Sequence, residues 1–376
     1  MSGPKKIKKP PVIILLLLII GAGVAAGCPG RQLFSHNDVL YPRITPNFSA
    51  PAVHCPVYSF PFGNGTVTLS IPLNNSVYAG AKSAEKDVVI YGNVSEEIWT
   101  AESYMAMVDD PLQEEFYTVL RAQFRKIRDA GSLDDNEYLE LITVFVQSLH
   151  YETVAENPPK FPIETFAEGS GDCDDKSLLL AGLLSREGYH VALFSFRPES
   201  HMAVGVSSPS AKFKNTSYTY IETTNLSFIC IVPEGLAGGI TLSSDPLVIP
   251  VGNGTRVYTA CDQTSAINNA YTASSKRAEQ LVPSLKDMDR QLEEKHSRID
   301  AASNNLQVLR QQGAIREYNA QVPSYNLLVA EYNRQRDQYR TMAAKYNSYV
   351  NIHGYILGHG YDRKGTYEWI IQHPLP

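Results

Sequence analysis

The feature that most restricts the fold is a seven-residue repeat in the last third of the chain. Apolar residues recur at Leu285, Leu292, Ile299 and Leu306, and a second apolar series lies between them. A heptad repeat of this kind is typical of a long helix with one apolar seam. At about 1.5 Å of rise per residue, such a helix projects several nanometres.

A tyrosine repeat continues the same spacing beyond Gly313, where we expect a turn. Pro323 requires a kink or a new helix start nearby. We therefore predict an antiparallel helical hairpin over residues 262–350, with the tyrosines packed at its seam rather than stacked on a ligand. Residues 351–376 form a tail whose histidines have spacings that suit no familiar zinc site. The tyrosines are Tyr318, Tyr325, Tyr332, Tyr339 and Tyr346, and the histidines are His353, His359 and His373.

The N-terminus differs from everything that follows it. Four lysines within residues 5–9 precede an uncharged apolar run at residues 12–27. Because basic residues stay on the cytoplasmic side of a membrane, we expect the rest of the chain outside the cell. An uncleaved signal anchor is favoured, and a cleaved signal peptide or a lipoprotein signal ending at Cys28 are the alternatives. Residues 1–28 are thus the predicted anchor region, and residues 29–55 a linker.

Glycosylation signals support export. Seven Asn-x-Ser/Thr triplets follow the apolar run, and none begins after Cys261. Such triplets are N-glycosylation acceptors in surface loops of secreted proteins, and chance occurrence is the alternative. They begin at Asn47, Asn64, Asn74, Asn93, Asn215, Asn225 and Asn253.

The five cysteines fit an oxidising compartment. Cys28 and Cys55 lie near the start, whereas Cys230 and Cys261 flank a loop-rich stretch, so these four can supply two disulfides. The sequence does not fix their connectivity. Cys173 is then the free thiol.

Residues 56–261 carry a mixed pattern of strands and helices. Alternating stretches at residues 66–73 and 87–92 predict strands. Three- and four-residue apolar spacing predicts two amphipathic helices between there and residue 152. The net charge of −6 offers no basic excess for neutralising phosphates, so no nucleic-acid partner is expected. The later strand segments are HVALFSF, HMAVGV and SYTYIETT.

The segment GSGDCDDKSLLLAGLL places Cys173 at the start of a helix. Asp172 is the expected N-cap, so Cys173 lies in the first turn, where backbone N–H groups and the helix dipole favour a thiolate. Adjacent residues do not share a helical face, so Asp174 and Asp175 should point away from the thiol. Apolar residues on the other sides predict a central, buried helix. An inert buried cysteine is the alternative.

A histidine and a carboxylate follow on two expected strands. His201 begins HMAVGV, and Glu222 shares one face of the next strand with Tyr218 and Tyr220. If the two strands pair, His201 and Glu222 become cross-strand neighbours at hydrogen-bonding distance. With Cys173 they make the set that a Cys–His–acid triad requires.

These segments together resemble the core of the transglutaminase-like superfamily. The nearest similarity is to its prokaryotic, surface-exposed branch, related to bacterial transglutaminase-like cysteine proteases. It is close from about Phe145 to Thr224 and looser over residues 56–261. The resemblance rests on PIETFAEGSGDCDDKSLLLAGLL, GYHVALFSF, HMAVGV and YIETT.

The resemblance implies an α+β, papain-like fold with the cysteine-bearing helix against an antiparallel sheet. It also implies a catalytic triad of Cys173, His201 and Glu222. The family carries Asp at the third position, so Glu is a departure, although its longer side chain can still reach a ring nitrogen. The oxyanion hole of the family combines the nucleophile's own N–H with an upstream side chain. Gln147 and Tyr151 are the candidates, and the alternative is that both pack against or cap their helix.

Some relatives bind calcium beside the active cysteine. Asp172, Asp174 or Asp175 could hold such an ion, although helix capping and solvation already explain these carboxylates. The resemblance implies no other cofactor or metal.

Two functions from different classes follow. The first is a membrane-anchored, outward-facing cysteine hydrolase, a protease or amidase, that forms a thioester on Cys173 with a peptide or protein substrate at the cell surface. A cross-linking transglutaminase is a variant of this function. The second is a catalytically silent binding or scaffold protein that self-associates through the helical hairpin.

Overall fold

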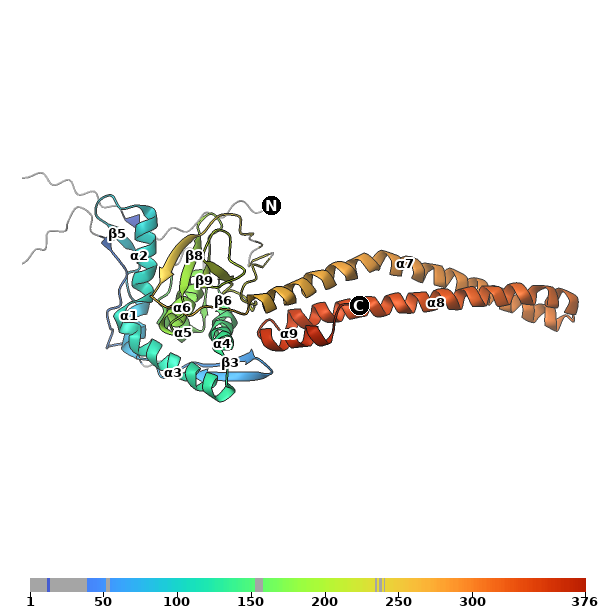
Figure 1. The fold of residues 1–376 in the computed structure, drawn as a ribbon, viewed down its shortest axis with the longest axis horizontal. Coiled ribbons are helices and arrows are strands. Elements are labelled where there is room, and N and C mark those ends of the chain that lie inside the picture. Colours follow the sequence, from blue (N-terminus) through green and yellow to red (C-terminus); the bar gives the residue numbers. More distant parts are fainter. Residues whose placement is uncertain are drawn as a thin grey trace, which may run out of the picture. The chain divides into compact units, whose positions relative to one another are not determined.

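The structure is a computed structural model, drawn in Figure 1, in which the chain divides into two compact units. The first comprises the described residues up to Ser265 together with Gly360–Lys364, and the second comprises Ala266–His359 and Gly365–Pro376. The secondary structure is mixed α/β, with a small antiparallel sheet and a long C-terminal helical region. The structure describes residues 12–13, 39–51, 55–152, 158–233, 235–236, 239 and 241–376.

A four-stranded antiparallel sheet in the order β10-β9-β8-β11 lies at the centre of the first unit. Phe196 stands opposite His201 where β8 and β9 pair, and Ile221 stands opposite Val204 where β10 and β9 pair. The three strands predicted around His201 are therefore confirmed. The strands are β8 (Val191–Phe196), β9 (His201–Ser207), β10 (Tyr218–Ile221) and β11 (Leu247–Val251).

Helix α6 (Cys173–Arg186) packs against this sheet. Its apolar residues from Leu178 to Leu184 are fully buried, so the predicted central helix is confirmed. The side chain of Asp172 accepts the backbone N–H groups of Asp174 and Asp175, which confirms the predicted N-cap. The other face of the sheet carries a separate aromatic cluster that includes Phe194, Phe196, Phe213, Tyr218 and Tyr220.

Further helices and short strands surround α6. The two predicted amphipathic helices are present as α3 and α4, and the predicted strands near residues 66 and 88 as β4 and β5. The helices are α1 (Asn75–Lys82), α2 (Glu96–Val108), η1 (Pro111–Gln113), α3 (Glu114–Gly131), α4 (Asp135–Ser148) and α5 (Pro162–Glu168). The strands are β1 (Val12–Ile13), β2 (Val39–Leu40), β3 (Val57–Phe62), β4 (Gly65–Ser70), β5 (Val88–Ile90), β6 (His150–Tyr151) and β7 (Ser170–Gly171).

The predicted linker is partly built into the first unit. β2 pairs antiparallel with β5, and buried Ile44 donates its backbone N–H to Asp110 at 2.8 Å. Residues 39–51 are therefore not a free connection, because their backbone groups find partners in the folded unit.

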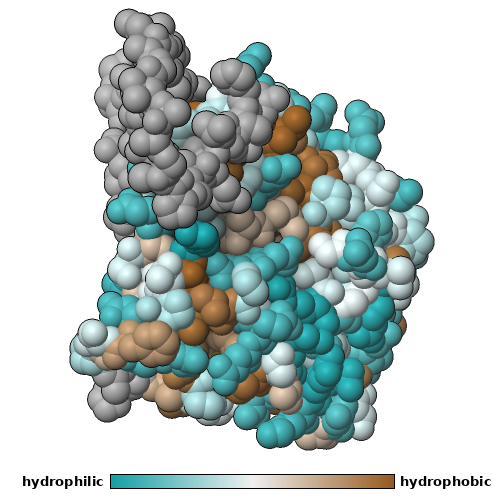
Figure 2. Space-filling model, turned by 90° about the vertical axis from the view of Figure 1, so that its left-hand side faces the viewer, coloured by the Kyte–Doolittle hydropathy of each residue, from teal (hydrophilic) through white to brown (hydrophobic). Residues whose placement is uncertain are grey.

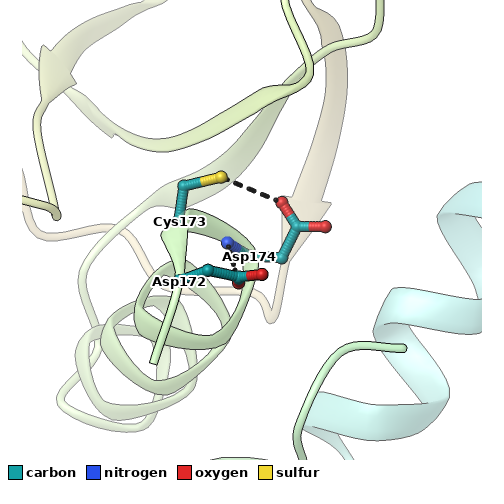
Figure 3. Close-up of side chains that lie close together, drawn as sticks. All are labelled: Asp172, Cys173 and Asp174. Atoms are coloured by element: carbon teal, nitrogen blue, oxygen red, sulfur yellow. Dashed lines mark hydrogen bonds between the residues drawn. The ribbon is translucent and has the colours of Figure 1, made fainter. Parts of the chain in front are cut away.

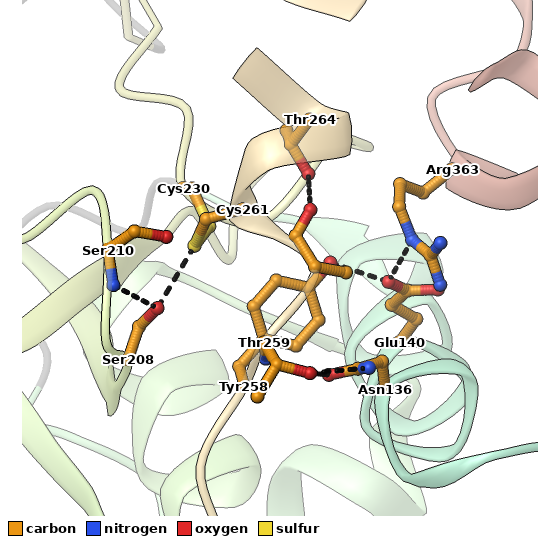
Figure 4. Close-up of a disulfide and its surroundings, with 11 residues drawn as sticks. Asn136, Glu140, Ser208, Ser210, Cys230, Tyr258, Thr259, Cys261, Thr264 and Arg363 are labelled. Carbon is orange, nitrogen blue, oxygen red and sulfur yellow. Dashed lines mark hydrogen bonds and ion pairs between the residues drawn. A yellow bond between two sulfur atoms is a disulfide. The ribbon is translucent and has the colours of Figure 1, made fainter. Parts of the chain in front are cut away.

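One of the two predicted disulfides is present. Cys230 is bonded to Cys261, with their Cα atoms 5.7 Å apart, and the bond lies beside a cluster of Tyr258, Glu140 and Arg363 (Figure 4). Cys55 is exposed and free, and Cys28, the fourth cysteine of the predicted set, lies outside the described residues.

The second unit is built on two long helices, α7 (Cys261–Gln311) and α8 (Ile315–Gly358). Several pairs of side chains join the helices, among them Asn305 with Gln321, Gln291 with Gln335, and Tyr271 stacked on His353. Later residues of α7 thus pair with earlier residues of α8, so the two helices run antiparallel. The predicted antiparallel hairpin is therefore confirmed (Figure 1).

Its details differ from the prediction in two respects. Pro323 lies inside α8 rather than at a break, because the new helix already starts at Ile315. The predicted tail is also helical, since α8 continues to Gly358 and α9 spans Arg363–Gln372. The turn at Gly313 is confirmed by its left-handed φ of 71°. The five tyrosines of the repeat are all partly buried.

The surface of the first unit carries the predicted glycosylation signals. All seven asparagines are exposed, as an acceptor site requires. The face drawn in Figure 2 is largely hydrophilic with separate hydrophobic patches. No helix within the part of the chain that is described has the length and apolar character needed to cross a bilayer. The predicted anchor at residues 12–27 lies outside the described residues except for strand β1, which pairs parallel with β5.

Candidate functional site

Cys173 is the first residue of α6, and its side chain is only 8% exposed. Its sulfur lies 3.4 Å from Oδ1 of Asp174 (Figure 3). It also lies 4.0 Å from the carbonyl oxygen of Ser200. The backbone N–H of Met202 also donates to the sulfur. The thiol therefore contacts the backbone of Ser200 and of Met202, the two residues that flank His201.

The expectation that both following aspartates point away from the thiol is wrong for Asp174. Its carboxylate turns back to the sulfur, and the hydroxyl of Tyr104 in α2 donates to the other oxygen at 3.3 Å. Asp175 does point elsewhere, because its oxygens accept the backbone N–H groups of Lys160 and Asp172. Helical periodicity separates Cα positions, but a short side chain in the first turn can still rotate toward its neighbour.

The expected preference for a thiolate is also wrong in this arrangement. Burial raises the pKa of the Cys173 thiol well above its ordinary value, and the charges of Asp174 and Asp172 raise it further, against the N–H of Met202. Burial and the charge of Asp172 raise the pKa of Asp174 itself to about 6. At neutral pH the resting site therefore holds a protonated thiol beside a charged carboxylate.

His201 and Glu222 form a buried pair at the start of β9. The ring Nε2 of His201 lies 3.4 Å from Oε2 of Glu222, so the predicted proximity is confirmed. Their relation in the sheet is not that of direct cross-strand partners. Strand β10 ends at Ile221, opposite Val204, and Glu222 follows the last paired residue.

Glu222 is held in its charged form. Its Oε1 accepts the backbone N–H groups of Thr223 and Thr224 at 3.0 and 2.9 Å and the hydroxyl of Thr224 at 2.6 Å. Burial opposes ionisation, but His201 and the hydroxyls of Thr224 and Tyr220 together lower the pKa of Glu222 to about 2. Glu222 is therefore a fixed negative charge beside the imidazole.

Gln147, one of the two oxyanion candidates, has a structural role. Both hydrogens of its amide are used, with Nε2 donating to the carbonyl oxygens of Glu222 and Ser227 at 2.7 and 3.0 Å. Its Oε1 accepts the backbone N–H of Ser227. The prediction of an oxyanion donor is corrected accordingly, because in this geometry Gln147 supports the backbone that carries Glu222.

Tyr151 remains an oxyanion candidate. It is partly buried in β6, which pairs with β7 immediately before the Cys173 helix. Burial raises the pKa of its phenol, and the next largest contribution comes from Cys173, so the two side chains lie within electrostatic reach.

Three further residues of the site were not predicted. Tyr104 comes from a helix about seventy positions upstream, and nothing in the sequence signals its contact with Asp174. Tyr220 hydrogen-bonds both His201 and Glu222, and its place on the same strand face was the available signal. Lys176 is fully buried and donates to the carbonyl oxygens of Gln147 and Leu149, so it holds the backbone at the end of α4.

The aspartates fit a calcium site poorly. One potential ligand atom each from Asp172, Cys173 and Asp174 lies within 4.8 Å of the others, but calcium requires six to eight oxygen ligands and does not favour a thiol. Oxygens of both carboxylates already accept hydrogen bonds, and Asp175 faces Lys160. We therefore derive no step from a bound ion.

Comparisons of the chain with protein-family models, curated proteins and solved structures found no match. The resemblance of the motifs to the transglutaminase-like superfamily therefore stays a prediction.

Proposed function

We propose that the chain is an outward-facing cysteine hydrolase of the transglutaminase-like type, acting on a peptide or protein amide through Cys173, His201 and Glu222. The observation that carries the proposal is the buried imidazole of His201, held 3.4 Å from a fully ionised Glu222. The backbone groups of Ser200 and Met202, the neighbours of His201, both contact the Cys173 thiol. A fixed carboxylate beside an imidazole is the arrangement that stabilises an imidazolium.

The chemistry uses the two ring nitrogens of His201 for different tasks. Nε2 faces Glu222, so Nδ1 is left to take the proton of the Cys173 thiol. The thiolate attacks the amide carbon, the C–N bond breaks, and the imidazolium returns the proton to the departing amine. Water then adds to the thioester with His201 as base, releasing the acid and restoring the thiol. A primary amine in place of water gives transamidation instead.

The reaction requires the thiol to leave its resting contact. The S–H now points to Asp174, whose carboxylate opposes thiolate formation. Rotation of the cysteine side chain toward the imidazole exchanges this repulsion for an attractive ion pair. Substrate binding that displaces Asp174 would favour the same change.

The location outside the cell is part of the proposal. It is supported by the Cys230–Cys261 disulfide, which suits an oxidising compartment, and by seven exposed glycosylation signals. The helix α6 against an antiparallel sheet agrees with the papain-like arrangement that the motifs imply, and the basic and apolar N-terminus suggests a membrane anchor.

Mass spectrometry of surface proteins tests the reaction type. Cells that carry the wild-type chain, Cys173→Ala or His201→Ala are compared for new protein termini and for glutamine–lysine cross-links. We expect new termini only with the wild-type chain, whereas cross-links in their place would assign transamidation. Identical profiles for all three chains would contradict an enzymatic role.

A catalytically silent scaffold is the second candidate. One observation favours it: the thiol hydrogen bond goes to Asp174, in a site that raises the thiol pKa. The hairpin, with helices of 51 and 44 residues, would supply the surface for self-association. Sedimentation of the full chain tests the scaffold. Concentration-dependent self-association that Leu327→Asp on exposed Leu327 abolishes would support it, and a monomer at all concentrations would remove it.

A further inference from the structure

Tyr220 lies between the imidazole and the carboxylate of the site. Its hydroxyl oxygen is 3.2 Å from Nε2 of His201, and it donates to Oε2 of Glu222 at 2.6 Å. The direct distance between the His201 and Glu222 atoms is 3.4 Å. The phenol therefore links ring and carboxylate by a second route, beside their direct contact.

We propose that Tyr220 is a positioning residue of the proposed triad, because its hydroxyl couples His201 to Glu222 and fixes which ring nitrogen carries the proton. This inference rests on the proposed function, since it assigns Tyr220 a task within that chemistry. Tyr220 touches neither the substrate nor the bond that breaks.

The direction of the hydrogen bonds follows from the charge of Glu222. An ionised carboxylate only accepts, so the hydrogen of Tyr220 points to Glu222 and a lone pair of its oxygen faces His201. Nε2 must then carry a hydrogen, and Nδ1 presents the lone pair that can receive the thiol proton. No proton moves through Tyr220 during the reaction. Burial and Glu222 both raise the pKa of its phenol, so it stays protonated.

Close packing around Tyr220 restricts the position of its hydroxyl. Tyr220 is 1% exposed, and its ring lies 5.4 Å from the ring of Phe213. Charged groups that act on His201 come from two elements, Glu222 after β10 and Asp174 on α6. Tyr220 is hydrogen-bonded to the first of these.

The same strand offers a matched control. Tyr218 lies two residues earlier on the same face, is also buried, and pairs its hydroxyl with Nε2 of His190 at 3.1 Å. Tyr218→Phe and Tyr220→Phe therefore each remove one oxygen atom and one tyrosine–histidine hydrogen bond, and Tyr220→Phe also removes the bond to Glu222. Only the second removal affects the proposed triad.

The test measures alkylation of Cys173 by iodoacetamide in the full chain, with peptide mass spectrometry as the readout. We expect Tyr220→Phe to slow alkylation about tenfold, the usual effect of losing one hydrogen bond to an ionised group. Tyr218→Phe should leave the rate unchanged. In a Glu222→Gln background, Tyr220→Phe should have little further effect, because coupled residues are not additive. A purely structural role would give an additive loss in that background.

The outcomes separate this inference from the proposed function. If His201→Ala leaves the wild-type rate unchanged, the proposed function fails. If His201→Ala slows alkylation but Tyr220→Phe does not, the function stands and the role of Tyr220 is overturned.

Nitrogen NMR of isotope-labelled wild-type protein is a second measurement, and it needs no variant to fold. We expect the neutral ring of His201 to be protonated at Nε2. A ring protonated at Nδ1 would overturn the inference.

Discussion

The sulfur of Cys173 lies 3.4 Å from Oδ1 of Asp174, the next residue in the chain. This contact has two consequences for the site. It gives the thiol an acceptor other than His201, and it places a negative charge where a thiolate would form. Tyr104 stabilises the arrangement through the other oxygen of Asp174. Asp174 thus holds the nucleophile in its protonated form.

Neutralising Asp174 should make Cys173 more reactive. Asp174→Asn keeps the shape but removes a charge that raises the pKa of the thiol, so the pKa should fall and alkylation at neutral pH should speed up about tenfold. The measurement is the pH dependence of Cys173 alkylation, with exposed Cys55 as internal control. An unchanged or slower rate at neutral pH would show that Asp174 does not restrain the thiol.

Glu222 should make the free energy of unfolding depend on pH in the acidic range. Its pKa is lowered from 4.5 to about 2 in the fold, so its contribution of roughly 3 kcal/mol is complete above about pH 5. The contribution is lost as the pH falls from 4.5 through 2, and it is absent below that range, where the carboxylate is protonated in both states. Urea denaturation at several pH values should show the wild type losing this advantage over Glu222→Gln. A difference that stays constant with pH would contradict the prediction.

Gln147 should contribute to the stability of the fold. Gln147→Leu leaves the carbonyl groups of Glu222 and Ser227 without their amide partner, which costs about 2–4 kcal/mol in free energy of unfolding. Ser148→Ala, at the end of the same helix, removes one hydrogen bond near the surface and should cost far less. Equal effects of the two substitutions on urea denaturation would argue against the role assigned to Gln147.

The Cys230–Cys261 disulfide closes a loop with a sequence separation of 31 residues. The chain-entropy relation assigns such a loop about 3–4 kcal/mol of stability. The double variant Cys230→Ser, Cys261→Ser should unfold at correspondingly lower urea concentration, and reductant should shift the wild type but not the variant. A wild type that is insensitive to reductant would show that the bond is not formed.

Much of the fold could be predicted because it depends on local patterns. The heptad spacing led to α7 and α8, and Asp172 with the apolar run after it led to α6. The proximity of His201 and Glu222 followed from pairing two neighbouring strands.

The side-chain contacts that decide the chemistry could not be predicted in the same way. The orientation of Asp174 depends on Tyr104, which reaches it from a helix remote in sequence. The role of Gln147 depends on the path of the backbone at Glu222 and Ser227, which no periodicity specifies. Tertiary contacts thus determine the protonation state of the Cys173 thiol. The position of Cys173 in its helix, taken alone, had predicted a thiolate.

The most direct test of the central claim, that His201 activates Cys173, is the ratio of two alkylation rates in one molecule. Cys173 and Cys55 are both free thiols, and Cys55 is exposed. Iodoacetamide labelling of the full chain at neutral pH gives both rates from the same digest. We predict that His201→Ala lowers the Cys173 rate relative to Cys55 by about a hundredfold, the lower end of the effect of losing a general base. An unchanged ratio would contradict the claim.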